Sequence, residues 1–117
     1  MDATELAVAL AGADDADVVR LVGDWMDRAA RDEALDLSVE PALESRRHVN
    51  ALVAAAAAQV ARDRSLPTPE WTLERTRMSE TFWHPGPAVL FANALVHAPG
   101  EFAIRGVFIE ADSLRCV

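Results

Sequence analysis

The 117-residue sequence has no lysine, no tyrosine and a single cysteine, Cys116. One cysteine cannot form a disulfide within the chain, which is typical of proteins from reducing compartments. No basic segment followed by an apolar stretch and a cleavage site opens the sequence. No apolar run reaches the roughly 20 residues that a membrane-spanning helix needs. We therefore expect a cytoplasmic protein that makes no use of a membrane. The all-arginine basic set and the abundant alanine are typical of a GC-rich bacterial genome.

Signatures of catalysis and of cofactor binding are also missing. The five glycines are scattered, so the sequence has no glycine-rich phosphate loop. The three histidines share no ligand spacing with each other or with Cys116, and no serine lies in a nucleophile elbow. The run Asp14-Asp15-Ala16-Asp17 lacks the later glycine and glutamate of an EF-hand loop, and a helix cap explains it better. The sequence predicts no metal, no cofactor and a role that is not enzymatic.

Acidic residues outnumber basic ones, and the excess lies in the first third of the chain. The net charge is −8, and residues 1–40 contain eleven acids against three arginines. Because an acidic surface repels phosphate, we expect no direct nucleic-acid binding, and a basic protein partner is favoured. Arginines of the middle third leave open an anion patch beside Trp71 and Trp83. Ion pairs between these arginines and the acidic N-terminal helix are the simpler interpretation. The arginines are Arg46, Arg47, Arg62, Arg64, Arg75 and Arg77.

Hydrophobic periodicity predicts a long central helix over residues 40–65. Pro41 occupies the expected first helical position, and Ala54 to Ala58 form the strongest helix-forming run in the chain. A second helix is predicted over 15–32, because one face collects its apolar residues at helical spacing. These apolar residues are Val18, Leu21, Val22, Trp25, Met26 and Ala29.

Shorter helices are predicted over residues 4–11, with Thr4 as the cap, and over 87–97, after Pro87. Residues 72–80 favour a helical turn or two. Residues 101–110 are ambiguous, since their first half is compatible with a helical turn and Val107 to Ile109 with an extended chain. The sequence therefore predicts an all-α fold: a compact bundle of four or five helices, with little or no sheet, in a single domain spanning 1–117.

Two segments carry a resemblance to known proteins: Pro69-Glu70-Trp71, and Phe102 to Ile109 in the pattern Phe-x-x-Arg-x-Val-Phe-Ile. Through them, residues 47–117 resemble a group of small bacterial proteins and C-terminal domains that are similar to the non-DNA-binding helical part of antitoxin-type regulators. The resemblance implies a regulatory partner for the product of a neighbouring gene, such as a toxin. A helix-turn-helix has no room ahead of the matching part, where the chain is acidic instead, which argues against operator binding.

Three hypotheses follow. The leading one is a protein-interaction module whose acidic second helix, through Asp24, Asp27, Arg20 and Arg31, binds a partner together with Trp71 and Trp83. The alternative is a small-molecule-binding module or minor enzyme with a pocket between the central and the 87–97 helices, formed by Arg47, Trp83 and His97. The third is a homodimer that buries the alanine face of the central helix.

Overall fold

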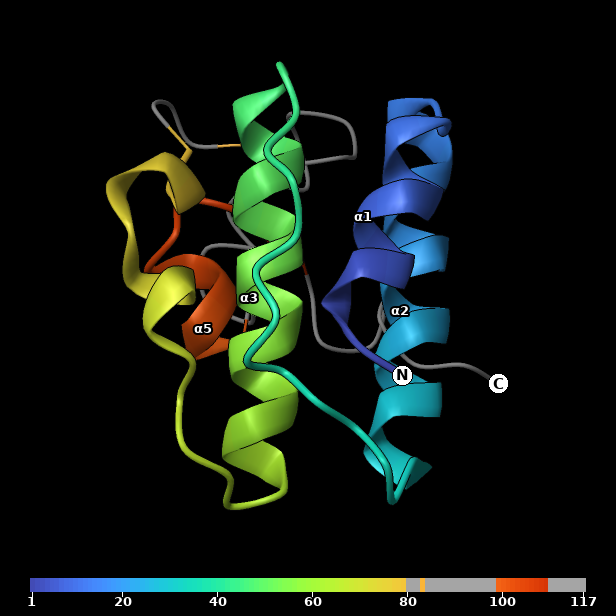
Figure 1. Ribbon diagram of the computed structural model, residues 1–117. Coiled ribbons are helices and arrows are strands. Elements are labelled where there is room, and N and C mark those ends of the chain that lie inside the picture. Colours follow the sequence, from blue (N-terminus) through green and yellow to red (C-terminus); the bar gives the residue numbers. More distant parts are fainter. Residues whose placement is uncertain (80–82, 84–98, 110–117) are drawn as a thin grey trace.

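The computed structural model describes residues 1–79, 83 and 99–109, and these residues form an all-α fold (Figure 1). Their helices, in chain order, are α1 (Ala3–Ala11), α2 (Asp15–Arg31), α3 (Arg47–Asp63), the 3₁₀ helices η1 (Glu70–Leu73) and η2 (Arg75–Arg77), and α5 (Gly100–Ala103). Within this part of the chain the only strand-like pairing is an isolated bridge between Trp83 and Val107. The prediction of a helical fold with little or no sheet is confirmed.

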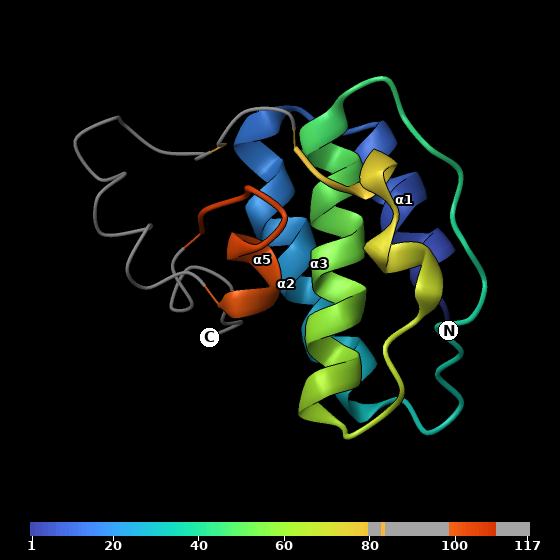
Figure 2. The same ribbon diagram turned by 90° about the vertical axis from the view of Figure 1, so that its left-hand side faces the viewer.

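Helix α3 lies at the centre, with α1 and α2 on one side and η1, η2 and α5 on the other (Figures 1 and 2). Twelve of its residues are buried, and Ala54 to Ala58 are at most 1% exposed. Small side chains let neighbouring segments approach the helix closely from several sides. The predicted central role of this helix is confirmed. These alanines are buried within the chain itself and leave no exposed alanine face, and the predicted homodimer stays a prediction.

The predicted start of the central helix at residue 40 is also wrong, because α3 begins at Arg47. The connector (residues 33–46) instead runs alongside α3 without helical structure (Figure 1). Two hydrogen bonds tie it there: the Glu44 amide donates to Asn50 Oδ1 at 2.8 Å, and Asn50 Nδ2 donates to the Glu44 carbonyl at 2.7 Å. The carbonyl of Pro41 also accepts from the buried Arg77. These tertiary contacts outweigh the local helix signal of Pro41.

Helix α2 matches its prediction to within one residue, and its apolar face packs inward. Val18, Val22, Trp25 and Ala29 are fully buried, whereas Leu21 and Met26 are only partly buried against the core. Helix α1 is capped two residues earlier than predicted: Asp2, and not Thr4, is the N-cap, and its carboxylate accepts from the Thr4 amide at 2.9 Å. The indole Nε1 of Trp25 donates to the Asp2 carbonyl at 3.2 Å, which fixes the N-terminal segment against α2.

The ambiguous C-terminal segment contains both of the structures that its sequence left open. Helix α5 supplies the helical turn, and Gly106 follows with a φ of 76°, a conformation that glycine adopts without strain. Val107 then pairs with Trp83.

The short helical turns predicted over 72–80 are present as η1 and η2. The helix predicted over 87–97 lies outside the described residues. None of the described helices has the length and apolarity to cross a membrane.

Candidate functional site

Three of the four acidic residues of α2, Asp17, Asp24 and Asp27, are paired with arginines of the same helix. Asp24 lies 3.3 Å from Arg28, one turn further along, and Asp27 pairs with Arg31 in the same way. Arg20 lies 3.9 Å from Asp17. All six side chains are substantially exposed, so each pair is worth little energy but cancels charge locally. The surface of α2 therefore carries positive and negative side chains side by side. Its role as a partner-binding face stays a prediction.

The N-terminal end of α2 is tied to the beginning of α3. Asp15 accepts from His48 Nε2 at 2.9 Å and from Arg46 at 3.1 Å. The hydrogen bond from His48, with the charges of His48 and Arg46, holds the pKa of Asp15 below its ordinary value of 3.8. The His48 ring in turn stacks on Trp83, with the ring centroids 4.8 Å apart. The predicted pairing of a middle-third arginine with the acidic helix is confirmed at Arg46.

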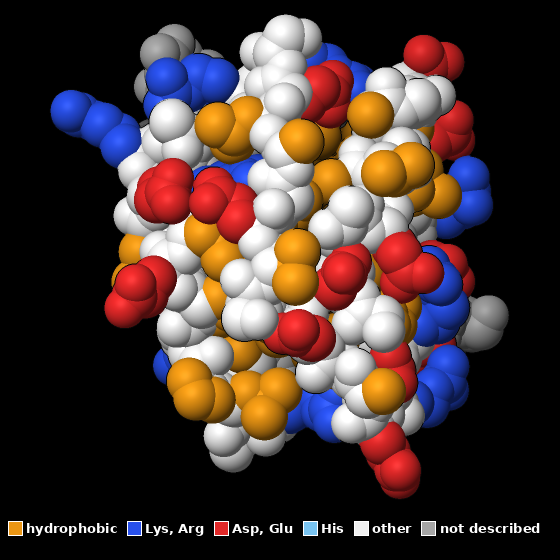
Figure 3. Space-filling model, in the orientation of Figure 1, with side chains coloured by type: hydrophobic (Ala, Val, Ile, Leu, Met, Phe, Trp, Pro, Cys, Tyr) orange, Lys and Arg blue, Asp and Glu red, His pale blue; other side chains and the backbone are white. Residues whose placement is uncertain are grey.

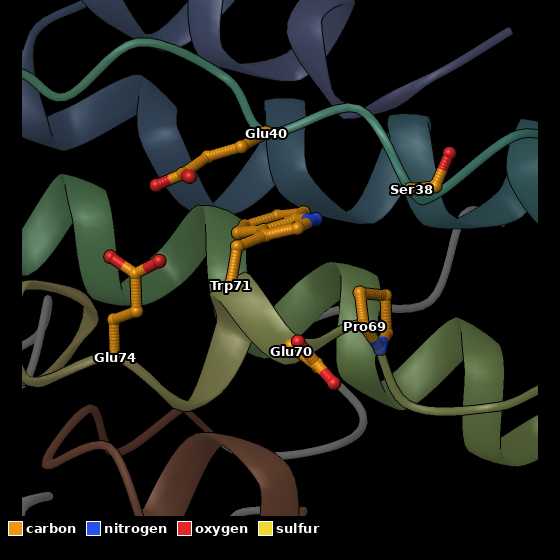
Figure 4. A pocket seen from close by; sticks show the side chains of 6 residues that line it. All are labelled: Ser38, Glu40, Pro69, Glu70, Trp71 and Glu74. Atoms are coloured by element: carbon orange, nitrogen blue, oxygen red, sulfur yellow. The ribbon is translucent and has the colours of Figure 1, made fainter.

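A shallow, open pocket of about 400 Å³ lies between the connector and the 3₁₀ helices. We call it the acidic pocket; its lining residues are Ser38, Glu40, Pro69, Glu70, Trp71 and Glu74. Figure 4 shows the carboxylates of Glu40 and Glu74 on the same side of the Trp71 ring, with Glu70 on the side of Pro69. Three carboxylates from separate segments thus surround one indole.

Trp71 forms the floor of the acidic pocket, and contacts with the connector and with Arg77 fix its position. Trp71 is only 6% exposed, and its Nε1 donates to the carbonyl of Leu37 at 2.9 Å. The guanidinium carbon of Arg77 lies 5.0 Å from the centroid of the indole ring, a cation–π contact. Arg77 is completely buried, which lowers its pKa, although Glu40 and Glu74 oppose that shift. Among the described residues its Nε and Nη1 have no hydrogen-bond partner.

Of the three carboxylates of the acidic pocket, only Glu40 has an ion pair among the described residues, whereas Asp17, Asp24 and Asp27 of α2 are all paired. Glu40 lies 3.7 Å from Arg77, too far for a hydrogen bond. Glu74 accepts only a long contact of 3.4 Å from the Thr76 hydroxyl. Within the described part of the chain Glu70 has neither an ion pair nor a side-chain hydrogen bond. Arg75 follows Glu74 and is exposed, but it does not line the pocket. The pocket therefore presents negative charge to solvent.

Exposed apolar side chains flank the acidic pocket on both of its walls. Leu73 of η1 is 57% exposed, and Val39 and Leu43 of the connector are 44% and 50% exposed. Figure 3 shows hydrophobic and acidic side chains interleaved over this face of the molecule. The backbone amides of the connector at Val39, Glu40, Ala42 and Leu43 donate no hydrogen bond to any described residue. Within the described part of the chain, these backbone donors of the pocket wall therefore have no acceptor.

The predicted site residues are distributed over different parts of the molecule. Trp71 lies in the acidic pocket, whereas Trp83 packs against His48 and does not line that pocket. Arg47 reaches from α3 to η2, where it donates to the Arg75 carbonyl at 3.1 Å. His97 lies outside the described residues, so the predicted small-molecule pocket at Arg47, Trp83 and His97 stays a prediction. The sequence does place Glu70 and Glu74 close together, but nothing local links them to Glu40.

The described residues contain no group of three His, Cys, Asp or Glu side chains arranged to hold a metal ion. The three carboxylates of the acidic pocket therefore surround Trp71 without converging on one point. Comparisons of the chain with family models, with curated proteins and with solved structures find no match. The resemblance to antitoxin-type regulators consequently stays an expectation from the sequence.

Proposed function

We propose that this protein is a protein-interaction module that binds a basic partner protein through the face around the acidic pocket. The observation that carries the proposal is a set of three carboxylates, Glu40, Glu70 and Glu74, placed between exposed apolar side chains; Glu70 and Glu74 have no ion pair within the described part of the chain. Charge complementarity steers association and selects partners, while apolar contacts supply most of the affinity. Both ingredients of a protein interface lie on this one face.

The acidic pocket suits a basic partner better than the surface of α2 does. On α2 each of Asp24 and Asp27 already has an arginine one turn away, so an incoming cation competes with an existing ion pair. At the pocket, Glu70 and Glu74 have no such competitor among the described residues. Association there neutralises charge without breaking a contact. The predicted interaction role is therefore transferred from α2 to the connector and η1.

The same geometry favours a protein over other ligands. A nucleic acid would bring phosphates against three carboxylates and be repelled. The pocket is shallow and open, unlike the enclosed, mainly apolar cavities that bury most of a small molecule. We further propose that the partner is the product of a neighbouring gene, which this chain regulates in the manner of an antitoxin.

Co-expression with each adjacent gene of the source genome tests this function. A stoichiometric complex is expected with one neighbour, preferably one that stops growth when it is expressed alone. The double variant Glu70→Arg/Glu74→Arg is expected to lose the complex, and Asp24→Arg/Asp27→Arg to retain it. The proposal fails if no neighbouring product copurifies with the wild-type chain. The location of the docking face is wrong if the α2 variant alone loses the complex.

A further inference from the structure

We infer that the acidic pocket accepts an arginine side chain presented by an extended segment of the partner, which lies along the connector. This inference rests on the proposed function and specifies the chemistry of the same site. It names one occupant, a basic peptide segment. A second copy of this chain is disfavoured because its net charge of −8 repels another copy of itself.

The arrangement of the carboxylates favours a guanidinium over a compact cation. Glu40 and Glu74 lie on one side of the indole and Glu70 on the side of Pro69, so a single small ion cannot contact all three at once (Figure 4). A guanidinium is planar, spreads its charge over five N–H donors and pairs with carboxylates in a bidentate manner. It also packs well beside an indole. The chain already uses this chemistry internally, where Arg77 lies over Trp71 and beside Glu40.

The existing contact of Glu40 leaves room for a new one. Its carboxylate is 42% exposed and lies 3.7 Å from the nearest nitrogen of Arg77. At that distance no hydrogen bond has to break before Glu40 accepts from an incoming guanidinium. Arg77 stays fixed by its hydrogen bond to the Pro41 carbonyl and by its contact with Trp71. The pocket is therefore preorganised, which reduces the ordering cost of binding.

The connector explains why the arginine should belong to an extended segment. Its amides at Val39, Glu40, Ala42 and Leu43 point to no acceptor within the described chain, so an adjacent strand-like peptide can supply carbonyl groups to them. Alternate side chains of an extended peptide face the same side. With arginine in the acidic pocket, apolar side chains two positions before and after it face the protein and have exposed partners at Val39, Leu43 and Leu73.

The test is an NMR titration of the ¹⁵N-labelled full chain with four matched peptides. Each peptide is acetyl-Leu-Ala-X-Ala-Leu-amide, in which X is arginine, lysine, citrulline or glutamate, so that both leucines face the same side as X. Citrulline is the decisive control because it keeps the shape of arginine and removes the charge. The arginine peptide is expected to shift the Trp71 indole N–H and the amides of Glu40, Glu70 and Glu74. We expect citrulline to bind at least about tenfold more weakly and lysine about threefold more weakly.

Matched variants connect the binding to the carboxylates. Glu70→Gln/Glu74→Gln changes charge at nearly constant shape and is expected to weaken the arginine peptide by about tenfold. Asp24→Asn/Asp27→Asn removes the same charge from α2 and should leave the affinity unchanged. Spectra of both free variants, well dispersed like the wild type, establish that each is folded. Equal binding of arginine and citrulline peptides, or shifts centred on α2, would overturn the inference.

Failure of this inference and failure of the proposed function give different results. If no peptide binds but Glu70→Arg/Glu74→Arg still destroys a complex with a neighbouring-gene product, the interaction role stands and the arginine pocket is refuted. If the arginine peptide binds as described while no neighbouring product copurifies, the pocket stands and the proposed partner is refuted.

Discussion

Carboxylates gather on two surfaces of this chain, along α2 and around the acidic pocket, and the two differ in how their charge is balanced. On α2, Asp17, Asp24 and Asp27 each have an arginine about one helical turn away, so these three aspartates have a partner on their own helix. At the acidic pocket the three glutamates come from the connector, from η1 and from the link between η1 and η2. Among the described residues the cation beneath the acidic pocket is Arg77. It is buried, lies over the Trp71 ring and donates a hydrogen bond to the Pro41 carbonyl.

The difference shows that the number of acidic residues in a segment is a poor guide to where negative charge is available. The first 40 residues have a net charge equal to that of the whole chain, −8, yet Asp17, Asp24 and Asp27 of α2 are paired with arginines of their own helix. Among the acidic residues that line the acidic pocket, only Glu40 comes from that region. Charge left without partners by the tertiary structure is the charge that a partner can use.

Replacing Arg77 with alanine is expected to lower the free energy of unfolding more than the other substitutions. It therefore gives the clearest contrast between the acidic pocket and α2. The change leaves a cavity beneath Trp71 and removes the donor to the Pro41 carbonyl, so the free energy of unfolding should fall by about 3 kcal/mol. Arg77→Met, which fills the space, should recover about half of that loss. Arg28→Ala on α2 should cost less than about 0.5 kcal/mol. Urea denaturation measures all three. A loss below about 1 kcal/mol for Arg77→Ala would show that Arg77 does not hold the connector.

Replacing Asn50 with alanine tests whether the connector depends on its own anchor. Asn50 is 5% exposed and makes two hydrogen bonds to the main chain of Glu44, so Asn50→Ala should destabilise the fold by about 2 kcal/mol. The matched control is Gln59→Ala, because Gln59 bonds only the exposed Asp63. Thermal unfolding of both variants provides the comparison. If the two variants unfold at the same temperature, the anchor at Glu44 contributes nothing.

Removing both charges from α2 should have a small effect on stability. Asp24→Asn/Asp27→Asn breaks two exposed ion pairs and should cost less than about 1 kcal/mol in total, with the loss vanishing in high salt. The measurement is urea denaturation at low and high salt concentration. A larger loss that persists in high salt would mean that these aspartates are structural rather than part of a self-neutralised surface.

The smallest effect concerns pH and Asp15, whose carboxylate is half exposed. Its folded-state pKa is depressed below 3.8, chiefly by the hydrogen bond from His48. The stabilisation is therefore fully present above the unfolded value and is lost as the pH falls through the folded pKa. The stability difference between the wild type and Asp15→Asn should be constant near pH 5 and shrink below about pH 4. A difference that grows on acidification would contradict the assigned direction.

The parts of the fold that the sequence predicts correctly are those determined by local periodicity. Val18, Val22, Trp25 and Ala29 repeat at helical spacing and are buried as expected. The alanine run likewise identifies the centre of the molecule. The connector was mispredicted because Pro41 is an acceptable helix start locally, and only contacts with Asn50 and Arg77 hold it in another conformation.

The candidate site was partly visible in the sequence. Glu70 and Glu74 are four positions apart in the sequence beside Trp71, a spacing that is equally typical of a solvated helix face. Glu40 lies 30 positions earlier in the chain, and no spacing rule connects it to that pair. Only the packing of Trp71 under the connector, through its bond to the Leu37 carbonyl, brings the three carboxylates together.

The most direct test of the central claim is a measurement of local electrostatic potential. Paramagnetic relaxation of amide protons is compared between a cationic nitroxide and its neutral counterpart, both added to the free protein. We predict that the cationic probe enhances relaxation more at Glu40, Glu70 and Glu74 than at Asp24 and Asp27. The preference at the acidic pocket should disappear in Glu70→Gln/Glu74→Gln. An equal or greater enhancement along α2 would contradict the claim that the acidic pocket, and not that helix, carries the available negative charge.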